Sequence, residues 1–265
     1  MSAAPPLSTI TLRDTQVRQA VAGQGEPLLL LHGWGANSAL VWDLAEQLIP
    51  QGYRAFAPDL PGFGQTPAPD QPWTVYDYAD WVMAYMDFHQ LERVYLFGHS
   101  FGGRLGIALG ALHPQRIIKM ALANSAGVRP KTSKLAQWRL GAYKGLRDQL
   151  TRLGARRLAE ELRRRYNARY ASSDFQATEG IFRQTFINVV REDMLPLAAQ
   201  VVPSTLLFWG DRDEDTPLWQ GQLLEKTIPD AGLIVYEGAG HYSYLERLAE
   251  TAHTMHYFFH QAPQA

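Results

Sequence analysis

The segment VYLFGHSFGG, residues 94–103, is the one from which the architecture of this chain can be inferred. Four apolar residues lead into GHSFG at 98–102, which has the spacing G-x-S-x-G, and a run of helical character follows. A serine on a sharp turn from a strand into a helix is exposed as a nucleophile. Glycines suit both sides of such a turn because it leaves no room for side chains. Helix amides after Ser100 would also direct partial positive charge at an anion formed during attack.

Short apolar runs alternate with segments of helical spacing along most of the chain. Helices are expected over 38–49, 76–89 and 101–112. An opening hairpin is expected over 8–13 and 15–21, and buried strands over 27–31, 53–57, 94–97, 117–123, 201–209 and 232–236. This alternation predicts an α/β fold, a mostly parallel sheet with helices on both faces. Reactive groups on such sheets gather at the carboxyl ends of the strands.

Residues 129–200 break this pattern, because strand signals vanish and helical stretches rich in Arg and Leu replace them. We interpret them as a helical cap inserted into a core domain formed by residues 1–128 and 201–265. The segment holds 15 Lys and Arg against 7 Asp and Glu. A solvated helix face explains this excess, since Glu160 and Glu161 precede Arg164 and Arg165 by four residues, a favourable order for ion pairs. The alternative is that a basic cap steers anionic substrates toward the site.

Composition limits the classes of function. The 265 residues are 46% hydrophobic, enough for one large core, and the net charge of -1 gives no sign of a nucleic-acid partner. The chain has no cysteine, which excludes disulfides, thiolate catalysis and cysteine-ligated metal. No apolar run approaches the roughly 20 residues needed to span a bilayer, and residues 1–10 do not resemble a secretory signal. We therefore expect a cytoplasmic protein with a small-molecule substrate and no membrane partner; the sequence does not predict the oligomeric state.

A serine at its ordinary pKa needs an adjacent base, which is usually a histidine. The chain has eight histidines, and only His241 follows an expected strand through a glycine turn, at 237–240. His99 is adjacent to Ser100, but the turn is expected to direct its side chain away from the serine hydroxyl. His241 is therefore the predicted base.

The acid that orients this histidine is expected in the loop at 210–217, which holds four acidic residues. Asp213 is favoured by its spacing from Gly210 at the end of the strand, and Asp211 and Asp215 are the alternatives. The loop after the preceding expected strand carries Asn124 in place of an acid.

The oxyanion of a tetrahedral intermediate needs two preorganised donors. The backbone N–H of Phe101 is one candidate, and the backbone N–H of Trp34, in the loop HGWG at 32–35, is the other. His32 and Gly33 of that loop are predicted to border the substrate. Candidate wall residues from the cap side are Trp138, Tyr143, Tyr166, Tyr170, Phe182 and Phe186.

Together these motifs resemble the α/β-hydrolase superfamily, over roughly residues 7–128 and 200–262. The matching segments are HGWG at 32–35, DLPGFGQT at 59–66, GHSFGG at 98–103, GDRD at 210–213 and GAGH at 238–241. The resemblance implies the α/β-hydrolase fold with Ser100, Asp213 and His241 as a catalytic triad, and it gives Asp59 a role in organising its loop. Haloalkane dehalogenases and epoxide hydrolases of this fold carry aspartate at the elbow, so Ser100 disfavours both.

The expected activity is hydrolysis of carboxylic esters through an acyl-enzyme, with no metal or organic cofactor. Carbon–carbon hydrolases of ring-cleavage pathways are an alternative, although they often carry asparagine where this chain has His99. Thioester or amide hydrolysis and perhydrolysis also remain open. A receptor without catalytic activity would be favoured by an incomplete triad, and every member is present in this sequence.

Overall fold

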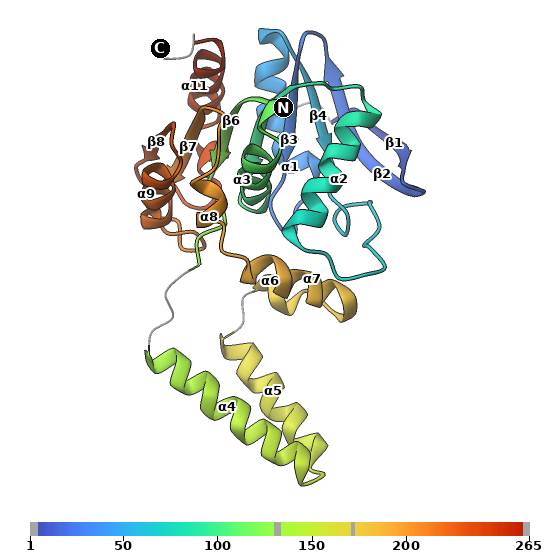
Figure 1. Cartoon of the computed structure of the whole chain (residues 1–265), viewed down its shortest axis with the longest axis vertical. Helices are drawn as coiled ribbons and strands as arrows, with labels where there is room; N and C mark the ends of the chain where they lie inside the picture. The colour runs from blue at the N-terminus through green and yellow to red at the C-terminus, as the bar shows by residue number, and fades with distance from the viewer. Residues whose placement is uncertain (1–4, 130–133, 171–172, 262–265) are drawn as a thin grey trace.

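A computed structural model describes residues 5–129, 134–170 and 173–261 of the chain. Its centre is an eight-stranded sheet with the order β1-β2-β4-β3-β5-β6-β7-β8 (Figure 1). The β1–β2 and β2–β4 pairs are antiparallel, and all the other pairs are parallel. The strands are β1 (Leu7–Leu12), β2 (Thr15–Gly23), β3 (Glu26–Leu31), β4 (Tyr53–Pro58), β5 (Val94–His99), β6 (Ile117–Ala123), β7 (Thr205–Gly210) and β8 (Ala231–Tyr236). The mostly parallel α/β sheet expected from the sequence is therefore confirmed.

Helices cover both faces of this sheet, which explains why its central strands are continuously apolar. In β3, Leu29 and Leu31 join one buried cluster, while Leu28 and Leu30 join the other. The first cluster includes residues of α2 (Val75–Phe88), α3 (Phe101–Leu112), α8 (Leu195–Ala198) and α9 (Leu218–Thr227). The second includes residues of α1 (Ser38–Leu48), α10 (Ser243–Glu246) and α11 (Leu248–His260).

The described residues between β6 and β7 contain helices and no strand. Helices α4 (Lys134–Arg152) and α5 (Arg156–Tyr170) form a hairpin that extends away from the sheet, and α6 (Ser173–Gln176) and α7 (Gly180–Arg191) lie nearer to it (Figure 1). The end of the segment packs as core, because Met194 and Ala198 have no exposed surface and belong to the first cluster. Only part of the 129–200 segment therefore projects from the body of the molecule.

The strand expected over 201–209 begins four residues late, at Thr205. Val201 donates its backbone N–H to Ala198 at the end of α8, over 3.3 Å, and Pro203 has no N–H to offer a neighbouring strand. Short 3-10 turns cover Ile49–Gln51 and Pro114–Arg116. Within the described ranges, every helix is too short or too polar to cross a membrane.

Candidate active site

The turn between β5 and α3 holds Ser100 in a backbone conformation that residues other than glycine rarely adopt, with φ at 51° and ψ at -107°. Glycines make the turn possible. A Cβ at Gly98 would lie 2.4 Å from the carbonyl oxygen of Gly102, and one at Gly102 would lie 2.0 Å from that of Leu31. Ser100 also donates its N–H to the Ala123 carbonyl at the end of β6, over 3.0 Å. Strain of this kind persists only where the surroundings enforce it, and it is concentrated at functional sites.

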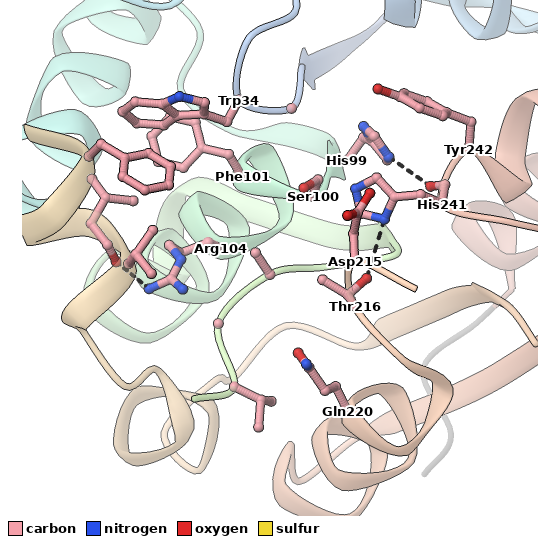
Figure 2. A pocket seen from close by; sticks show the side chains of 17 residues that line it. Trp34, His99, Ser100, Phe101, Arg104, Asp215, Thr216, Gln220, His241 and Tyr242 are labelled. Atoms are coloured by element: carbon pink, nitrogen blue, oxygen red, sulfur yellow. Dashed lines mark hydrogen bonds between the residues drawn. The ribbon is translucent and has the colours of Figure 1, made fainter. Parts of the chain in front are cut away.

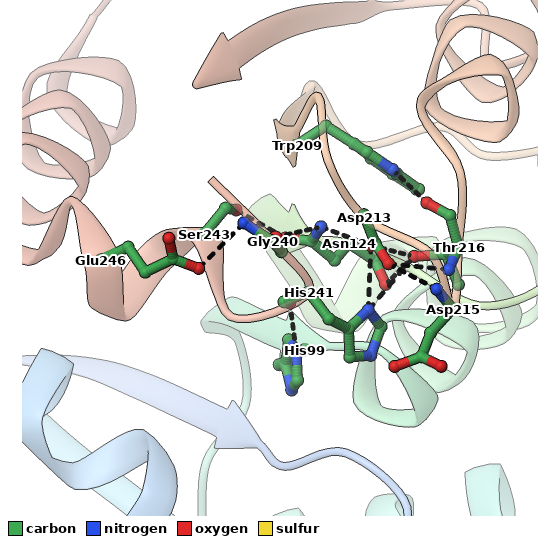
Figure 3. Close-up of polar contacts among 10 residues, drawn as sticks. All are labelled: His99, Asn124, Trp209, Asp213, Asp215, Thr216, Gly240, His241, Ser243 and Glu246. Carbon is green, nitrogen blue, oxygen red and sulfur yellow. Dashed lines mark hydrogen bonds and ion pairs between the residues drawn. The ribbon is translucent and has the colours of Figure 1, made fainter. Parts of the chain in front are cut away.

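His241 follows β8, and its Nδ1 lies 2.9 Å from Oδ2 of Asp213 (Figure 3). The carboxylate accepts this hydrogen bond, so Nδ1 carries the proton and Nε2 is left with a free lone pair. The two alternative acids make other contacts. Asp211 accepts the N–H of Gly238 over 2.7 Å, and Asp215 donates its own N–H to Asp213. Of the three acids, Asp213 is the one that orients His241.

Asp213 is buried among hydrogen-bond donors. Its Oδ1 accepts the backbone N–H groups of Asp215 and Thr216, over 2.8 and 2.9 Å. Its Oδ2 accepts the Thr216 hydroxyl and the Asn124 amide, each over 2.6 Å, in addition to His241. Burial by itself raises the pKa of Asp213, but the hydrogen bonds from His241 and Thr216 outweigh it and lower the pKa to about 2. The carboxylate is therefore ionised at neutral pH.

Asn124, directly after β6, links this carboxylate to the loop that carries His241. Its Nδ2 donates to Asp213, and also to the carbonyl of Gly240 over 3.3 Å. Its Oδ1 accepts the hydroxyl of Ser243 over 2.5 Å (Figure 3). Asn124 adopts a positive φ of 46°, which asparagine tolerates better than most residues. An acid at this position would place a second negative charge against Asp213. The amide of Asn124 is uncharged and donates a hydrogen bond to that carboxylate.

His99 contacts the same loop from the opposite side. Its Nε2 lies 3.0 Å from the His241 carbonyl oxygen, to which it donates, and its Nδ1 has no partner among the described residues. Gly33 permits this packing, because a Cβ there would lie 2.9 Å from His99 Nδ1. Burial, reinforced by nearby His241, lowers the pKa of His99 to about 3, so the ring is neutral. Sequence reasoning missed this contact, since nothing in GHSFG indicates it.

Ser100 and His241 both line a pocket of about 510 Å³ at the carboxyl ends of the strands (Figure 2). Three further predicted residues also border this pocket, namely Gly33, Trp34 and Phe101. Within the turns and loops that the structure describes, the N–H groups of Trp34 and Phe101 donate to no backbone carbonyl. They remain the two candidate donors for an oxyanion.

The cap side contributes through α7. Phe186 lines the pocket as expected, and Phe182, one helical turn before it, stacks on Trp34 with ring centroids 5.1 Å apart. Phe186 and Phe101 also pack edge-on against Trp34, with ring centroids 5.0 and 5.2 Å away. Figure 2 shows Trp34 and Phe101, the labelled members of this aromatic wall, on one side of Ser100.

Three expected pocket residues lie elsewhere. His32 is fully buried behind the lining, where its Nε2 accepts the N–H of Leu60 over 3.0 Å. Trp138 is 72% exposed on α4, and Tyr143 stacks on Tyr166 of α5 with centroids 4.0 Å apart. Tyr143 therefore packs within its own hairpin and Trp138 is largely exposed to solvent, whereas the pocket is lined by residues of α7. The side chain of Tyr170 falls outside the described residues.

Asp213, Asp215 and His241 also form a group that could hold a metal ion, since one potential ligand atom from each lies within 4.8 Å of the others. Both oxygens of Asp213 and the Nδ1 of His241 are already engaged in hydrogen bonds. A metal would have to compete with these bonds, so the arrangement suits proton transfer better than metal binding.

A family model described as the alpha/beta hydrolase fold matches residues 26–248. The chain belongs to the α/β-hydrolase fold family. It is 28% identical over 254 residues to Lipase 1 of Psychrobacter immobilis, and this match covers 86% of this chain and 75% of the lipase. It is 29% identical over 257 residues to the 2-hydroxymuconate semialdehyde hydrolase of Pseudomonas sp. strain CF600, covering 92% and 90% of the two chains.

Among solved structures, a meta-cleavage product hydrolase from Pseudomonas fluorescens IP01 superimposes with a TM-score of 0.72 at 25% identity. The match covers 95% of this chain and 97% of that chain. Family membership makes this protein a hydrolase. Its relatives include both a lipase and a 2-hydroxymuconate semialdehyde hydrolase, so the substrate has to be inferred from the site.

Proposed function

We propose that the protein hydrolyses carboxylic esters through an acyl-enzyme intermediate on Ser100. The observation that carries this proposal is the 2.9 Å hydrogen bond between Asp213 and His241, next to a serine on a strained turn that lines the same pocket. It gives the imidazole the tautomer that a general base requires, with the lone pair on Nε2.

In the proposed reaction, His241 Nε2 takes the proton of the Ser100 hydroxyl as its oxygen attacks the ester carbonyl. The Trp34 and Phe101 amides stabilise the oxyanion, and the buried Asp213 carboxylate stabilises the imidazolium. His241 then returns the proton to the leaving alkoxide, and the alcohol departs. Water, activated by the same base, hydrolyses the acyl-enzyme. These steps call for no metal or organic cofactor.

We also propose that residues 129–200 act as a cap over the small-molecule substrate, with α7 as the part that touches it. Phe186, Val189 and Val190 of α7 line the pocket, which supports this role. The α4–α5 hairpin is more distant from the elbow (Figure 1).

The test is hydrolysis of p-nitrophenyl esters from acetate to laurate by the wild type and by Ser100→Ala. We expect the variant to lose several orders of magnitude in kcat/KM, because the nucleophile is removed. Ser204→Ala, at the opposite end of β7, is the matched control and should retain wild-type rates. Near-normal turnover by Ser100→Ala would refute the proposal.

Carbon–carbon hydrolysis is the second candidate, supported by similarity to the 2-hydroxymuconate semialdehyde hydrolase over nearly the whole chain. The test is incubation with 2-hydroxymuconate semialdehyde beside the ester panel, with consumption of the substrate followed by chromatography. Turnover of that substrate with no cleavage of any ester would replace the first proposal by the second.

A further inference from the structure

Arg104 is a charged side chain that the mechanism above does not use. It lies one turn into α3, where its backbone N–H donates to the Ser100 carbonyl over 3.1 Å. Its side chain lines the pocket, yet the residue is only 5% exposed. In Figure 2 it lies on the same side of the pocket as Trp34 and Phe101, away from Asp215. The chain therefore buries a guanidinium within one helical turn of the candidate nucleophile.

The protein satisfies this group only in part. One nitrogen, Nη1, donates to the carbonyl oxygens of Val189 and Glu192 at the end of α7, over 2.6 and 2.8 Å. Among the described residues, no carboxylate forms an ion pair with Arg104, and its Nε and Nη2 make no hydrogen bond. The nearby Glu192 carboxylate accepts the Tyr76 hydroxyl over 3.0 Å instead.

This cation keeps its charge at neutral pH. Burial lowers the pKa of Arg104 to about 10, while Glu192 and Asp193 act in the opposite direction. Taking a charge out of water without a directly paired counter-charge is unfavourable. Nε and Nη2 are also not sealed from solvent, since neither is among the fully buried polar atoms that lack a partner. Two guanidinium nitrogens of a residue that lines the pocket therefore keep N–H groups available for a ligand.

We infer that Arg104 binds a carboxylate of the substrate, which makes the preferred substrates esters that carry a second, anionic carboxyl group. This inference rests on the proposed ester hydrolysis and specifies its substrate class. Guanidinium is suited to the task because its planar N–H groups match a carboxylate. Asp215 repels an anion at the His241 end of the pocket, so the carboxylate is directed to the Arg104 end. The aromatic wall of Trp34, Phe101 and Phe186 then contacts the hydrocarbon chain of the substrate between its ester group and its carboxylate.

Arg104 also ties α7 to α3 through the Val189 and Glu192 carbonyls, and a purely structural role has to be separated from substrate binding. Loss of the tie would impair all substrates alike and lower the melting temperature. Loss of carboxylate binding would impair only charged substrates. The discriminating quantity is therefore a ratio, kcat/KM for a charged ester divided by kcat/KM for its neutral counterpart.

The substrate pair is p-nitrophenyl hydrogen glutarate and p-nitrophenyl methyl glutarate, which differ only in the remote carboxyl group. We expect the wild type to prefer the charged ester by about 10- to 100-fold, the range of a hydrogen-bonded charge pair. In Arg104→Met the ratio should fall to about 1, and Arg104→Lys should retain part of it. A wild-type ratio of 1 or below, or a ratio unchanged in Arg104→Met, would overturn the inference.

Steering by the basic α4–α5 helices could also favour anions, and two controls separate it. Arg163→Met removes one exposed charge from α5 and should leave the ratio unchanged. Raising the salt concentration to 0.5 M screens long-range attraction but acts weakly on a buried pair, so most of the preference should persist. A preference that disappears in salt, or falls equally in both Met variants, would assign it to steering.

Binding to the Ser100→Ala protein tests the inference without turnover. Calorimetric titration with monomethyl glutarate should give at least tenfold tighter binding than with dimethyl glutarate, and Arg104→Met in the same background should abolish the difference. This result with no esterase activity in the wild type would retain the anion site and reject the proposed reaction. Esterase activity without the charge preference would do the reverse.

Discussion

At the scale of single residues, the acid loop shows how local hydrogen bonds select one carboxylate among four. Asp213 receives five donors, including two backbone amides from its own turn, while Asp211 receives the Gly238 amide outside the pocket. The turn folds back over Asp213 because Thr216 supplies both an N–H and a hydroxyl. This concentration of donors, and not proximity alone, keeps the buried carboxylate charged.

Asp213→Asn should lower kcat/KM for p-nitrophenyl acetate by about 10⁴-fold with little change in fold. The asparagine amide would donate to Nδ1 of His241 and move the ring proton to Nε2, where it blocks proton abstraction. Asp211→Asn is the matched control and should stay within about threefold of wild type. Equal losses in the two variants would mean that the loop, and not the Asp213 charge, supports the reaction.

At the scale of elements, the β5–α3 turn works because strand and helix backbones approach too closely for any side chain. Gly102 is held against Leu31 of β3, and Gly98 against the first turn of α3. The sheet thereby fixes the position of the serine before any substrate arrives. The stability of the fold and the geometry of the site are coupled at these two glycines.

Gly102→Ala should therefore destabilise the protein by about 3 kcal/mol, because its Cβ would meet the Leu31 carbonyl oxygen and the strand or the helix would have to move. Gly141→Ala in α4 meets nothing within 4 Å and should be neutral or stabilising by up to about 1 kcal/mol. Urea unfolding of both variants beside the wild type measures the difference. Similar free energies for the two variants would contradict the close approach.

The sequence predicts those parts of the site that depend on chain order and turn chemistry. Ser100, Asp213 and His241 each follow a strand in a motif with a local spacing, and the strands alternate with helices. It does not predict contacts made between distant segments. Arg104 and His99 become notable only when burial is known, and α7 faces the elbow where α4 was an equally good candidate. The amphipathic pattern of a helix shows which face is buried, but not against which partner.

At the scale of the whole molecule, the site is enclosed by buried histidines that must remain neutral. Burial lowers the pKa of His32 to about 4 and that of His99 to about 3. In the unfolded chain both would titrate near 6.5. Below pH 6.5 the unfolded state therefore binds more protons than the folded state. The free energy of unfolding decreases as the pH is lowered. The free energy of unfolding is therefore highest above pH 6.5, and it falls progressively as the pH drops toward the folded-state pKa values of about 4 and 3.

The resulting prediction concerns the slope of stability with pH. Between pH 7.5 and 5, His32 and His99 should together remove about 4 kcal/mol from the free energy of unfolding, roughly half from each. His99→Asn retains an amide able to donate toward the His241 carbonyl but cannot titrate. Its free energy of unfolding should therefore decrease by about 2 kcal/mol less than that of the wild type over this pH range. Urea unfolding at half-unit pH steps measures both curves, with exposed His253→Asn as the control that follows the wild type. Parallel curves for wild type and His99→Asn would show that His99 titrates alike in the folded and unfolded chains. The buried ring would then not be the neutral donor that holds the His241 loop in place.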